Sequence, residues 1–596
     1  MKTALTLLFI FFIGITVSFT QVTVKNGTSV YVTNEIVYVK GNIELTTATD
    51  NITLRNEAQF IQGEPATTTN TGLGFISVFQ EGDANAYHYN YWSSPVGNTS
   101  NTVINNPYSL TLLRDGDATS ANFGGLSAFT TSLEGTWSPL TISTKWMYVF
   151  AGTAWSAISQ SDAIAVGNGF TLKGTDNSGT NNGAGVTLQG QRYEFRGKPN
   201  SGDITVATTV NEHYLLGNPY SSALDADQFI LDNAAVIKDN TLYFWDQWGA
   251  SSHYSSDYEG NYATYMSAGL GLGVAVAATT SLITGSANPS VKVPKRYIPI
   301  AQGFFIDADA TGTVTFKNTQ RPKDILGLVS FQDTYKESAT SGGSVFLKSA
   351  KANQQKTTST NRIHYYLGNK MTFPTLVFNI KINEQFNRHL LLLLRPDADE
   401  TVQEGKEAQM YDELSSDAFW AIDDKKYSIQ SDAFFEDKRI PLGMKANTDS
   451  EFVVSIEANE YNAPTDVYLY DTVTETEYSL ATAQNISLSA GNYIDRFEIR
   501  FKSSTLSIDN TIFTDFDTYY NSLSKELVVV NPTFLEIKKV TIFDVVGKQI
   551  YVKKVVKTEE SQPKQHFSVQ NVPSGIYIVK VTSKNNGIFT KKLHLN

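Results

Sequence analysis

The chain contains no cysteine among its 596 residues. This absence excludes disulfides, thiolate metal sites, thiol nucleophiles and redox motifs. Charged residues are also scarce, at 18%, whereas tyrosine, phenylalanine, glycine and threonine-rich runs are common, and this balance favours strands and turns over helices. We therefore expect an all-β protein in which each module is held by its own hydrophobic core.

The common catalytic fingerprints are missing as well. The sequence has no G-x-S-x-G, H-E-x-x-H, P-loop or G-x-G-x-x-G pattern, and its seven histidines are scattered without the spacing of metal ligands. A glycosidase needs no short motif but does need two carboxylates about 5 to 10 Å apart. Glu194, Asp246 and Asp257 lie near aromatic residues, yet nothing in the sequence pairs them. We predict no catalytic residue and a protein that is not an enzyme.

The length predicts several modules, because about 150 residues per domain is typical. Residues 1–20 have the basic start, apolar run and small residues of a signal peptide, and the run is too short for a bilayer-spanning helix. We then expect a β-rich segment over 21–74, a duplicated β-sandwich region over 75–325, a β-sandwich over 326–505 and a small immunoglobulin-like sandwich over 506–596. We expect no permanent membrane span.

Short β-branched and aromatic runs recur every seven to nine residues between Val22 and Gln62. This spacing is close to the rungs of a β-helix, although a stack of hairpins fits nearly as well.

Residues 75–324 contain an internal repeat. Leu215-Leu216-Gly217-Asn218-Pro219 follows the pattern of Tyr91-Trp92-Ser93-Ser94-Pro95, and Gly303-Phe304-Phe305 follows that of Gly169-Phe170-Thr171. Val314-Thr315-Phe316 is matched with Val186-Thr187-Leu188. The kept order predicts two related halves whose loops differ.

Two further segments carry specific expectations. Residues 263–288 are uncharged and rich in glycine and alanine, which predicts a mobile loop or a hairpin, with a lipid- or partner-facing patch as the alternative. Leu390 to Leu394 is expected to be a strand covered on both faces.

The C-terminal residues carry a resemblance. TIFDVVGKQI, VPSGIYIVKVTS and FTKKLHLN, in this order and spacing, are similar to the C-terminal sorting domain of proteins exported by the type IX secretion system of Bacteroidetes. The positions that define the pattern here are Gly547, Pro573, Gly575, Tyr577, Lys591 and Lys592. The resemblance implies a translocon and a sortase-like processing peptidase as partners, and a place at the cell surface or in the medium.

Blocks of the preceding region have a resemblance of their own. Tyr89 to Gly97, Leu216 to Ala226 and Tyr297 to Phe305 look like parts of uncharacterised flavobacterial surface proteins. No activity is attached to these blocks, so the likeness implies only the class of protein.

Charge is spread unevenly. From Thr511 onward there are 12 lysines against 7 Asp plus Glu, a net charge of +5, which leaves −17 for the preceding residues because the whole chain carries −12. The acidic part argues against nucleic acid as a partner. The basic part fits an acidic translocon or a lipopolysaccharide surface, and equally fits ordinary solvated lysines.

Two weaker patterns concern ligands. Asp307 and Asp309 alternate before Gly312 as at the start of a calcium loop, but no glutamate stands at position twelve, so the prediction is no cofactor with calcium as the alternative. The aromatic residues Tyr243, Phe244, Trp245, Trp248, Tyr254 and Tyr258 could stack on sugar rings. Because strand alternation sends Tyr243 and Trp245 to one face, we expect half of them in the core and select Trp245, Trp248, Tyr254 and Tyr258 as ligand-binding residues.

These patterns together favour one function. We expect an exported type IX cargo that acts at the cell surface as a binding or adhesion protein, with an extracellular polysaccharide as the candidate ligand. The alternatives are a secreted polysaccharide-degrading enzyme and a structural surface-layer or stalk component.

Overall fold

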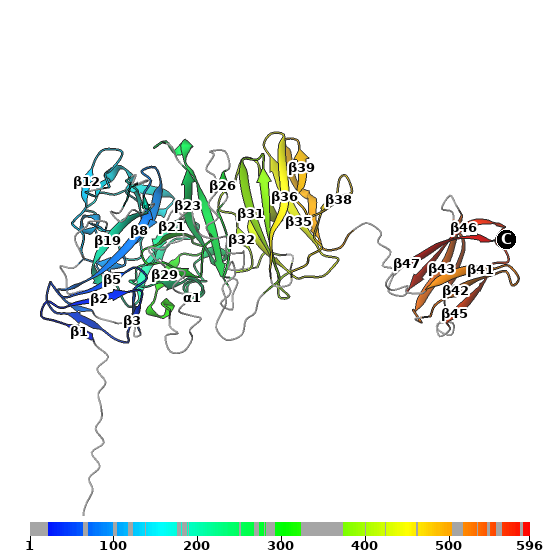
Figure 1. The fold of residues 1–596 in the computed structure, drawn as a ribbon, viewed down its shortest axis with the longest axis horizontal. Coiled ribbons are helices and arrows are strands. Elements are labelled where there is room, and N and C mark those ends of the chain that lie inside the picture. The colour runs from blue at the N-terminus through cyan, green and yellow to red at the C-terminus, as the bar shows by residue number, and fades with distance from the viewer. Residues whose placement is uncertain are drawn as a thin grey trace, which may run out of the picture. The chain divides into compact units, whose positions relative to one another are not determined.

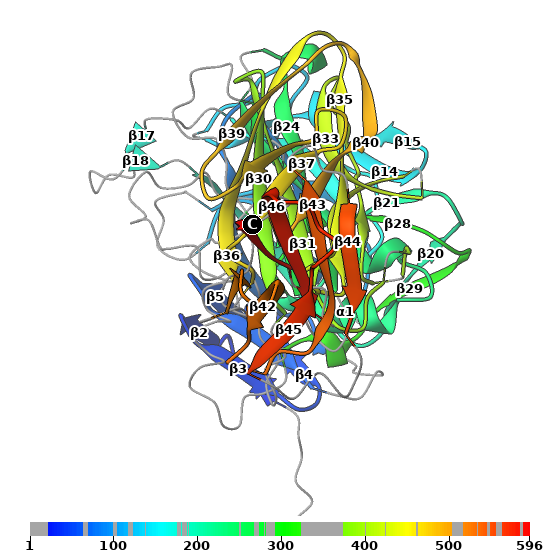
Figure 2. The same ribbon diagram turned by 90° about the vertical axis from the view of Figure 1, so that its right-hand side faces the viewer.

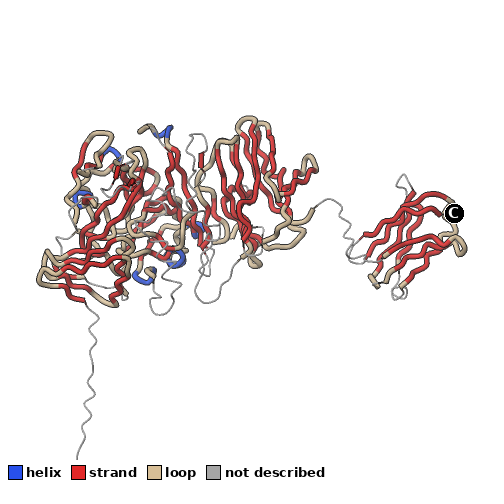
Figure 3. The backbone as a smooth tube through the Cα atoms, viewed as in Figure 1, coloured by secondary structure: helices blue, strands red, loops and turns tan. Residues whose placement is uncertain are grey.

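The computed structural model describes most of the chain after residue 21. The described ranges are 22–63, 70–98, 104–116, 123–137, 139–175, 180–181, 187–188, 190–249, 252–267, 273–278, 280–281, 293–322, 373–399, 401–403, 405–423, 425–460, 463–503, 516–532, 534–544, 549–555, 563–583 and 588–595. Strands dominate these ranges, and the one α-helix in them, α1 (Ala226–Asp232), has seven residues (Figures 1 and 3). The predicted all-β class is confirmed. No helix in these ranges has the length and apolar character needed to cross a membrane.

The chain forms two compact units that divide between Phe501 and Lys502. Each unit has its own hydrophobic core, and the second unit begins four residues before the expected sorting domain.

The first unit begins with a short parallel β-helix. Its strands are β1 (Val22–Val24), β2 (Ser29–Thr33), β3 (Ile36–Val39), β4 (Ile43–Leu45), β5 (Asn51–Arg55), β6 (Gln59–Gln62), β7 (Thr71–Gly72) and β8 (Phe75–Asp83). Each strand pairs in parallel with the strand three further along the chain, so three consecutive strands form one turn of the coil. Of the two predictions for this segment, the β-helix is confirmed and the hairpin stack is wrong.

The last strand of the β-helix also belongs to the next module. β8 pairs in parallel with β5 and antiparallel with β19 (Gly190–Pro199), so one sheet runs through both. The expected boundary at residue 74 is therefore a turn inside a continuous sheet.

The duplicated region supplies two sets of strands. The first set is β9 (Tyr89–Trp92), β10 (Val96–Gly97), β11 (Arg114–Asp115), β12 (Ala128–Thr130), β13 (Thr141–Ser143), β14 (Tyr148–Gly152), β15 (Ala154–Ala157), β16 (Phe170–Lys173), β17 (Thr180–Asn181), β18 (Thr187–Leu188) and β19, with the short 3-10 helices η1 (Leu110–Leu112) and η2 (Thr144–Trp146). The second set is β20 (Ile204–Thr208), β21 (His213–Gly217), β22 (Leu224–Asp225), β23 (Thr241–Gly249), β24 (Glu259–Ser267), β25 (Gly273–Val276), β26 (Thr280–Ser281), β27 (Tyr297–Ile298), β28 (Gly303–Asp307) and β29 (Gly312–Phe316), with α1 and the 3-10 helices η3 (Lys238–Asn240), η4 (Ser255–Asp257) and η5 (Asn318–Gln320).

The two halves pair their strands in the same way. Trp92 lies opposite Phe170 in β9 and β16, and Leu216 lies opposite Phe304 in β21 and β28. β8 pairs with β19 as β20 pairs with β29. By this pairing the counterpart of β29 is β19, a few residues after the Val186–Leu188 run that the sequence pattern selected.

Glycines allow the two halves to approach each other closely. A Cβ on Gly169 would lie 2.6 Å from Cγ of Leu215, and a Cβ on Gly303 would lie 2.8 Å from the backbone carbon of Tyr91. Gly169 and Gly303 hold equivalent places in the repeat, and so do the strands that they face. The Gly-Phe pairs of the repeat therefore mark where each half passes over the other.

A seven-stranded sheet in the order β15-β14-β21-β28-β23-β24-β25 is central to the second half. One face carries Leu216, Phe244, Tyr265, Phe304 and Ile306, which pack with α1 in a hydrophobic core. α1 begins where the Asp225 side chain accepts hydrogen bonds from the backbone N–H groups of Asp227 and Gln228, as an N-cap residue does. The opposite face carries the aromatic side chains described below.

In the uncharged segment over 263–288 the structure describes residues 263–267, 273–278 and 280–281, and the side chains of 263–267 and 273–278 are buried. β24 and β25 form the antiparallel hairpin at the sheet edge, and β26 pairs with β31 (Phe386–Leu394) of the third module. Met266, Val274 and Val276 pack against Leu391 and Leu393. The predicted hairpin is correct for β24 and β25, and burial between modules explains the absence of charge in these two strands.

The third module is a single sheet. Its strands are β30 (Thr375–Ile382), β31, β32 (Ala408–Gln409), β33 (Asp417–Ile422), β34 (Lys425–Asp432), β35 (Arg439–Ala446), β36 (Ser450–Glu460), β37 (Tyr468–Asp471), β38 (Thr476–Ser479), β39 (Gln484–Leu488) and β40 (Gly491–Arg500) (Figure 2). Together with β26 they form 12 hydrogen-bonded strands around one core. A sandwich was predicted, but alternation shows only that one face is buried and does not show how many sheets the strands form.

Leu390, Leu392 and Leu394 enter the core of the third module, while Leu391 and Leu393 face the hairpin of the second half. The prediction that this strand is covered on both faces is confirmed.

The second unit is a two-layer sandwich. One layer contains β41 (Asp517–Asn521), β42 (Glu526–Val530) and β45 (Lys564–Ser568), and the other contains β44 (Gln549–Lys554), β43 (Ile537–Asp544), β46 (Gly575–Ser583) and β47 (Ile588–Leu595). The layers enclose a core of Leu527, Val529, Val540, Ile542, Val579 and Val581.

Candidate binding site

A band of aromatic side chains covers the second face of the seven-stranded sheet. Strand register places Phe150 opposite Trp155, Leu215 opposite Phe305, Tyr243 opposite Phe305 and Trp245 opposite Tyr262. Tyr89 and Tyr91 of β9 and Tyr411 of the third module also belong to this cluster. We call the set the aromatic band, defined as Tyr89, Tyr91, Phe150, Trp155, Tyr243, Trp245, Tyr262, Phe305 and Tyr411.

The rings of the band contact one another over its whole length. Tyr91 stacks on Trp245 with ring centres 5.8 Å apart and planes 13° apart. Phe305 lies 5.2 Å from Phe150 and 5.7 Å from Tyr262 between ring centres. Such offset and edge-to-face pairs add stability beyond buried area, so these rings are held in defined orientations.

Trp155 is the exposed member of the band. It lies on the edge strand β15 and is 41% exposed. Its ring centre is 5.1 Å from Phe150, 5.7 Å from Phe305 and 5.7 Å from Tyr91, with interplanar angles between 64° and 78°. The indole is therefore supported by three rings while part of its surface remains open to solvent.

Polar groups accompany the rings at the end of the band near Tyr411. The ring of His213 lies 6.1 Å from that of Tyr411, and its Nδ1 contacts a carboxylate oxygen of Asp307. The hydroxyls of Tyr91 and Tyr262 are 3.2 Å apart. Burial raises the pKa of Tyr262 well above its ordinary value, so the phenol keeps its proton and can donate a hydrogen bond.

A buried lysine closes the other end of the band. Nζ of Lys173 lies 4.0 Å from the centre of the Trp146 ring, 4.5 Å from that of Tyr258 and 4.7 Å from that of Tyr89. It donates a hydrogen bond of 2.7 Å to Oη of Tyr258 and lies 3.3 Å from Nδ1 of His253. Cation–π contacts of this kind gain strength when the cation is desolvated.

This lysine joins the two halves of the repeat. Lys173 and Trp146 belong to the first half, and His253 and Tyr258 belong to the loop that carries η4 in the second. Burial lowers the pKa of Lys173 to about 8, and burial together with Lys173 lowers the pKa of His253. Nε2 of His253 lies 3.4 Å from Oε1 of Glu134.

The predicted sugar-stacking residues have different surroundings. Trp245 is half-buried beneath Tyr91, Tyr258 contacts Lys173, and Tyr254 is 76% exposed. Tyr243 and Phe244 lie on opposite faces of β23 and are both buried. Trp248 lies in β23, but its side chain is outside the described residues. The structure thus brings Trp245 and Tyr258 into one aromatic region, with Tyr254 on the adjoining loop.

Asp307 and Asp309, the residues of the calcium alternative, make other contacts. Asp307 contacts His213, and the backbone N–H of Asp309 donates to the carbonyl of Val236. Among the described residues, no three His, Asp or Glu side chains are grouped so that they could hold a metal ion.

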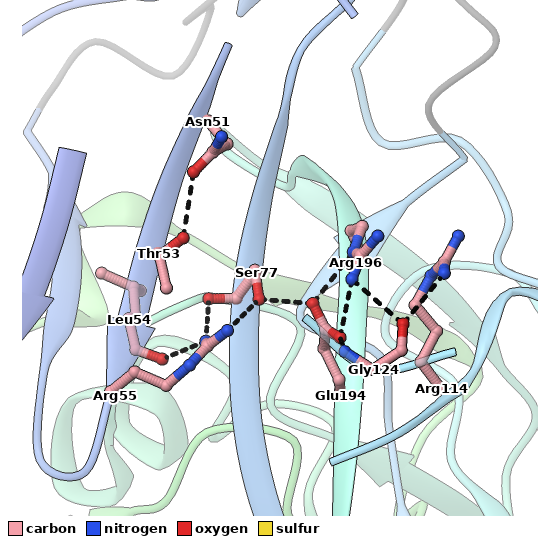
Figure 4. Close-up of polar contacts among 9 residues, drawn as sticks. All are labelled: Asn51, Thr53, Leu54, Arg55, Ser77, Arg114, Gly124, Glu194 and Arg196. Atoms are coloured by element: carbon pink, nitrogen blue, oxygen red, sulfur yellow. Dashed lines mark hydrogen bonds and ion pairs between the residues drawn. The ribbon is translucent and has the colours of Figure 1, made fainter. Parts of the chain in front are cut away.

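Glu194, a carboxylate considered for glycosidase chemistry, is fully buried and saturated with hydrogen bonds. It accepts from Oγ of Ser77 at 2.6 Å, from the backbone N–H of Gly124 at 2.6 Å, and from the Arg196 guanidinium at 2.8 and 2.9 Å (Figure 4). Arg55 of the β-helix donates to the same Ser77 hydroxyl at 2.9 Å. Glu194 therefore holds the β-helix against the first half of the repeat.

The other two carboxylates lie in different surroundings. Asp246 is 1% exposed within β23, and Asp257 is an exposed residue of η4 that accepts from Oγ of Ser252. Glu194 has no accessible lone pair to offer as a partner, so the structure provides no two-carboxylate arrangement that includes it.

The residues of the sorting pattern lie in the second unit. Oη of Tyr577 donates to the carbonyl of Pro573 at 2.8 Å and closes the turn that ends at Gly575. Lys591 forms an ion pair with Asp517, and Lys592 is exposed on β47. Gly547 lies outside the described residues. These contacts explain the turn and the strand ends, and the sorting role remains a prediction.

Sequence reasoning missed Trp155, Tyr411, Trp146, Lys173 and His253. Tyr411 reaches the band from a different module, and Lys173 and His253 belong to different halves of the repeat. These contacts depend on which strands pair across long sequence separations, and local sequence patterns do not contain that information.

No curated protein matches the chain. A domain of unknown function, DUF8694, matches residues 521–595 within the second unit, and a second one, DUF8693, matches residues 10–501. Neither match indicates a catalytic family. Because the latter match covers most of the chain, this protein belongs to the DUF8693 family.

Proposed function

We propose that this protein is an exported cell-surface protein that binds a polysaccharide through its aromatic band. The observation that carries the proposal is Trp155, an exposed indole supported by Phe150, Phe305 and Tyr91. The flat face of an aromatic ring packs against the C–H face of a pyranose. Because the supporting rings already hold the indole, a bound sugar loses little affinity to ordering of the protein.

The neighbouring polar groups suit the same ligand. His213 and Asp307 lie beside Tyr411, and their side chains are 41% and 14% exposed. Sugar hydroxyls need both donors and acceptors, and this mixture supplies both.

Export is the second part of the proposal. The support for it is the signal-like N-terminus, the resemblance of the last residues to type IX sorting domains, and the separate core of the second unit. A sorting domain that is cleaved off must fold separately, so that its removal does not expose the hydrophobic core of the remaining chain. The second unit has its own core and meets this requirement.

Non-catalytic binding is favoured over polysaccharide degradation. All the acceptor positions of Glu194 are used by structural hydrogen bonds, and Asp246 is buried within β23, so neither carboxylate is available to a substrate. The enzyme alternative would gain support if the purified chain released oligosaccharides from a polysaccharide that it binds.

Binding is tested on a glycan array with the chain from residue 21 and with Trp155→Ala. We expect the variant to lose about two- to tenfold in affinity, because an aromatic ring contact contributes about 0.5 to 1.5 kcal/mol. The matched control is Tyr31→Ala, which removes a 58% exposed ring from the β-helix. Absence of binding to every polysaccharide, or equal losses in both variants, would contradict the proposal.

Export is tested by deleting residues 506–596 in the native host. The shortened chain should remain in the periplasm, and mass spectrometry of surface material should find the N-terminus near Gln21 and no sorting domain. Unchanged surface display of the shortened chain would refute the sorting role.

A further inference from the structure

The outer face of one sheet in the second unit combines exposed apolar residues with lysines. In the four strands β43, β44, β46 and β47, the inward positions Val540, Ile542, Tyr551, Val579, Val581 and Leu593 pack in the core. Strand alternation therefore turns the residues between them outward. The apolar outward residues are Phe543, Ile550, Val552, Ile576 and Ile578, and the basic ones are Lys539, Lys554, Lys580 and Lys592.

Register brings these residues together on neighbouring strands. Ile578 lies opposite Phe543 on one side and opposite Lys592 on the other, and Thr541 lies opposite Val552 and Lys580. Ile550, Val552, Ile576 and Ile578 are 36%, 48%, 46% and 40% exposed. A solvent-facing side of an antiparallel sheet is normally polar, so this apolar stripe needs a partner.

We propose that this face, which we call the basic-apolar face, docks on a membrane surface that carries anionic lipids. Lysine ammonium groups are attracted to lipid phosphates, and the aliphatic side chains between them enter the headgroup region. The described outward positions of the four strands carry four lysines and no Asp or Glu, which matches an anionic surface. The inference goes beyond sorting, because it concerns what the unit touches and not whether it is removed.

Two other occupants fit less well. A second copy of the same face would set four lysines against four lysines, and this repulsion opposes a symmetric dimer. Protein interfaces are enriched in Tyr, Trp and Arg and depleted in Lys, whereas every cation here is Lys. The composition therefore favours lipid over protein.

The test is co-sedimentation of the chain from residue 21 with vesicles of phosphatidylcholine alone and of phosphatidylcholine mixed with phosphatidylglycerol. We expect binding to the anionic vesicles only, with a loss on adding salt, because exposed charges are screened. The variant Lys580→Glu/Lys592→Glu should lose at least about tenfold in partitioning, since each basic residue contributes a severalfold gain near an anionic surface. Ile576→Ser/Ile578→Ser should weaken binding at unchanged charge.

The matched control is Lys25→Glu/Lys381→Glu, which reverses two exposed lysines of the first unit. It should bind anionic vesicles as the unaltered chain does. All variants change solvent-facing positions, and their thermal unfolding checks that the core is intact. Equal partitioning to neutral vesicles, equal losses in the control, or no binding to the anionic vesicles would overturn the proposal. Photo-crosslinking from position 552 to an envelope protein would then identify a protein as the partner.

Discussion

Lys173 and Trp146 form a cation–π pair in which Nζ lies 4.0 Å from the ring centre. Both belong to the first half of the repeat, and the same ammonium also donates to Tyr258 of the second half. Among the described residues, the Lys173 ammonium is thus stabilised by aromatic rings and a hydroxyl, whereas a buried ammonium usually pairs with a carboxylate. This arrangement makes the junction between the halves sensitive to the charge of one side chain.

Lys173→Met should change how stability depends on pH. The pKa of Lys173 in the folded chain is about 8 against an ordinary value of 10.5, so the folded state binds fewer protons than the unfolded state between these values. The contribution of Lys173 to the free energy of unfolding should therefore rise with pH through this window, so the unfolding free energy of the unaltered chain should increase relative to that of the variant. The measurement is denaturant unfolding of both proteins across the window.

Lys145→Met, which removes the exposed lysine next to Trp146, is the control for this experiment. It should keep the pH dependence of the unaltered chain. An identical dependence in all three proteins would show that Lys173 is not held as described.

Glu407→Gln should remove a pH dependence of opposite sign. Burial raises the pKa of Glu407 from an ordinary 4.5 to about 7, so the folded state binds more protons than the unfolded state between these values. The contribution of Glu407 to stability is greatest below pH 4.5 and is lost as pH rises through 7. The difference in unfolding free energy between variant and unaltered chain should therefore grow with pH, whereas Glu413→Gln, at a half-exposed position, should show no such trend.

Gly303→Ala should destabilise the first unit by about 1 to 3 kcal/mol, the usual cost of overpacking. The added methyl would lie 2.8 Å from the backbone carbon of Tyr91, and that strand cannot move without disturbing the other half. Gly125→Ala is the matched control, because an added Cβ there meets no atom within 4 Å. Chemical denaturation of the two variants should separate them, and equal stabilities would contradict the close packing of the halves.

Glu194→Gln should cost about 3 to 5 kcal/mol, because it leaves the Arg196 guanidinium without its buried partner. Glu35→Gln changes an exposed glutamate of the β-helix and should cost less than about 0.5 kcal/mol. If glycan binding persists in folded Glu194→Gln, the carboxylate has the structural role assigned to it. A stable variant that specifically loses ligand would instead place Glu194 in the site.

Local patterns predicted much of the architecture. The spacing of short runs between Val22 and Gln62 indicated β-helix rungs, because each rung repeats the same side-chain alternation over a fixed length. The opposite faces taken by Tyr243 and Phe244 followed from the two-residue period of a strand. These features are determined by residues that are close together in the sequence, and local patterns therefore predict them.

Composition and alternation could not predict which strands meet. The sequence pattern selected Val186–Leu188 as the counterpart of β29 in the first half, whereas the strand pairing selects β19. The third module reads as a sandwich because each strand buries one face, yet its strands join in one sheet.

By itself the sequence determined the all-β class, the repeated halves and the alternation of buried and exposed side chains, because these follow from local periodicity and composition. Only the tertiary structure decided that Trp155 rests on Phe305, that Tyr411 completes the aromatic band, that Lys173 lies among three rings and that Glu194 is buried. The physical reason is that these contacts join residues far apart along the chain, and strand register, which depends on the packing of whole sheets, brings them together.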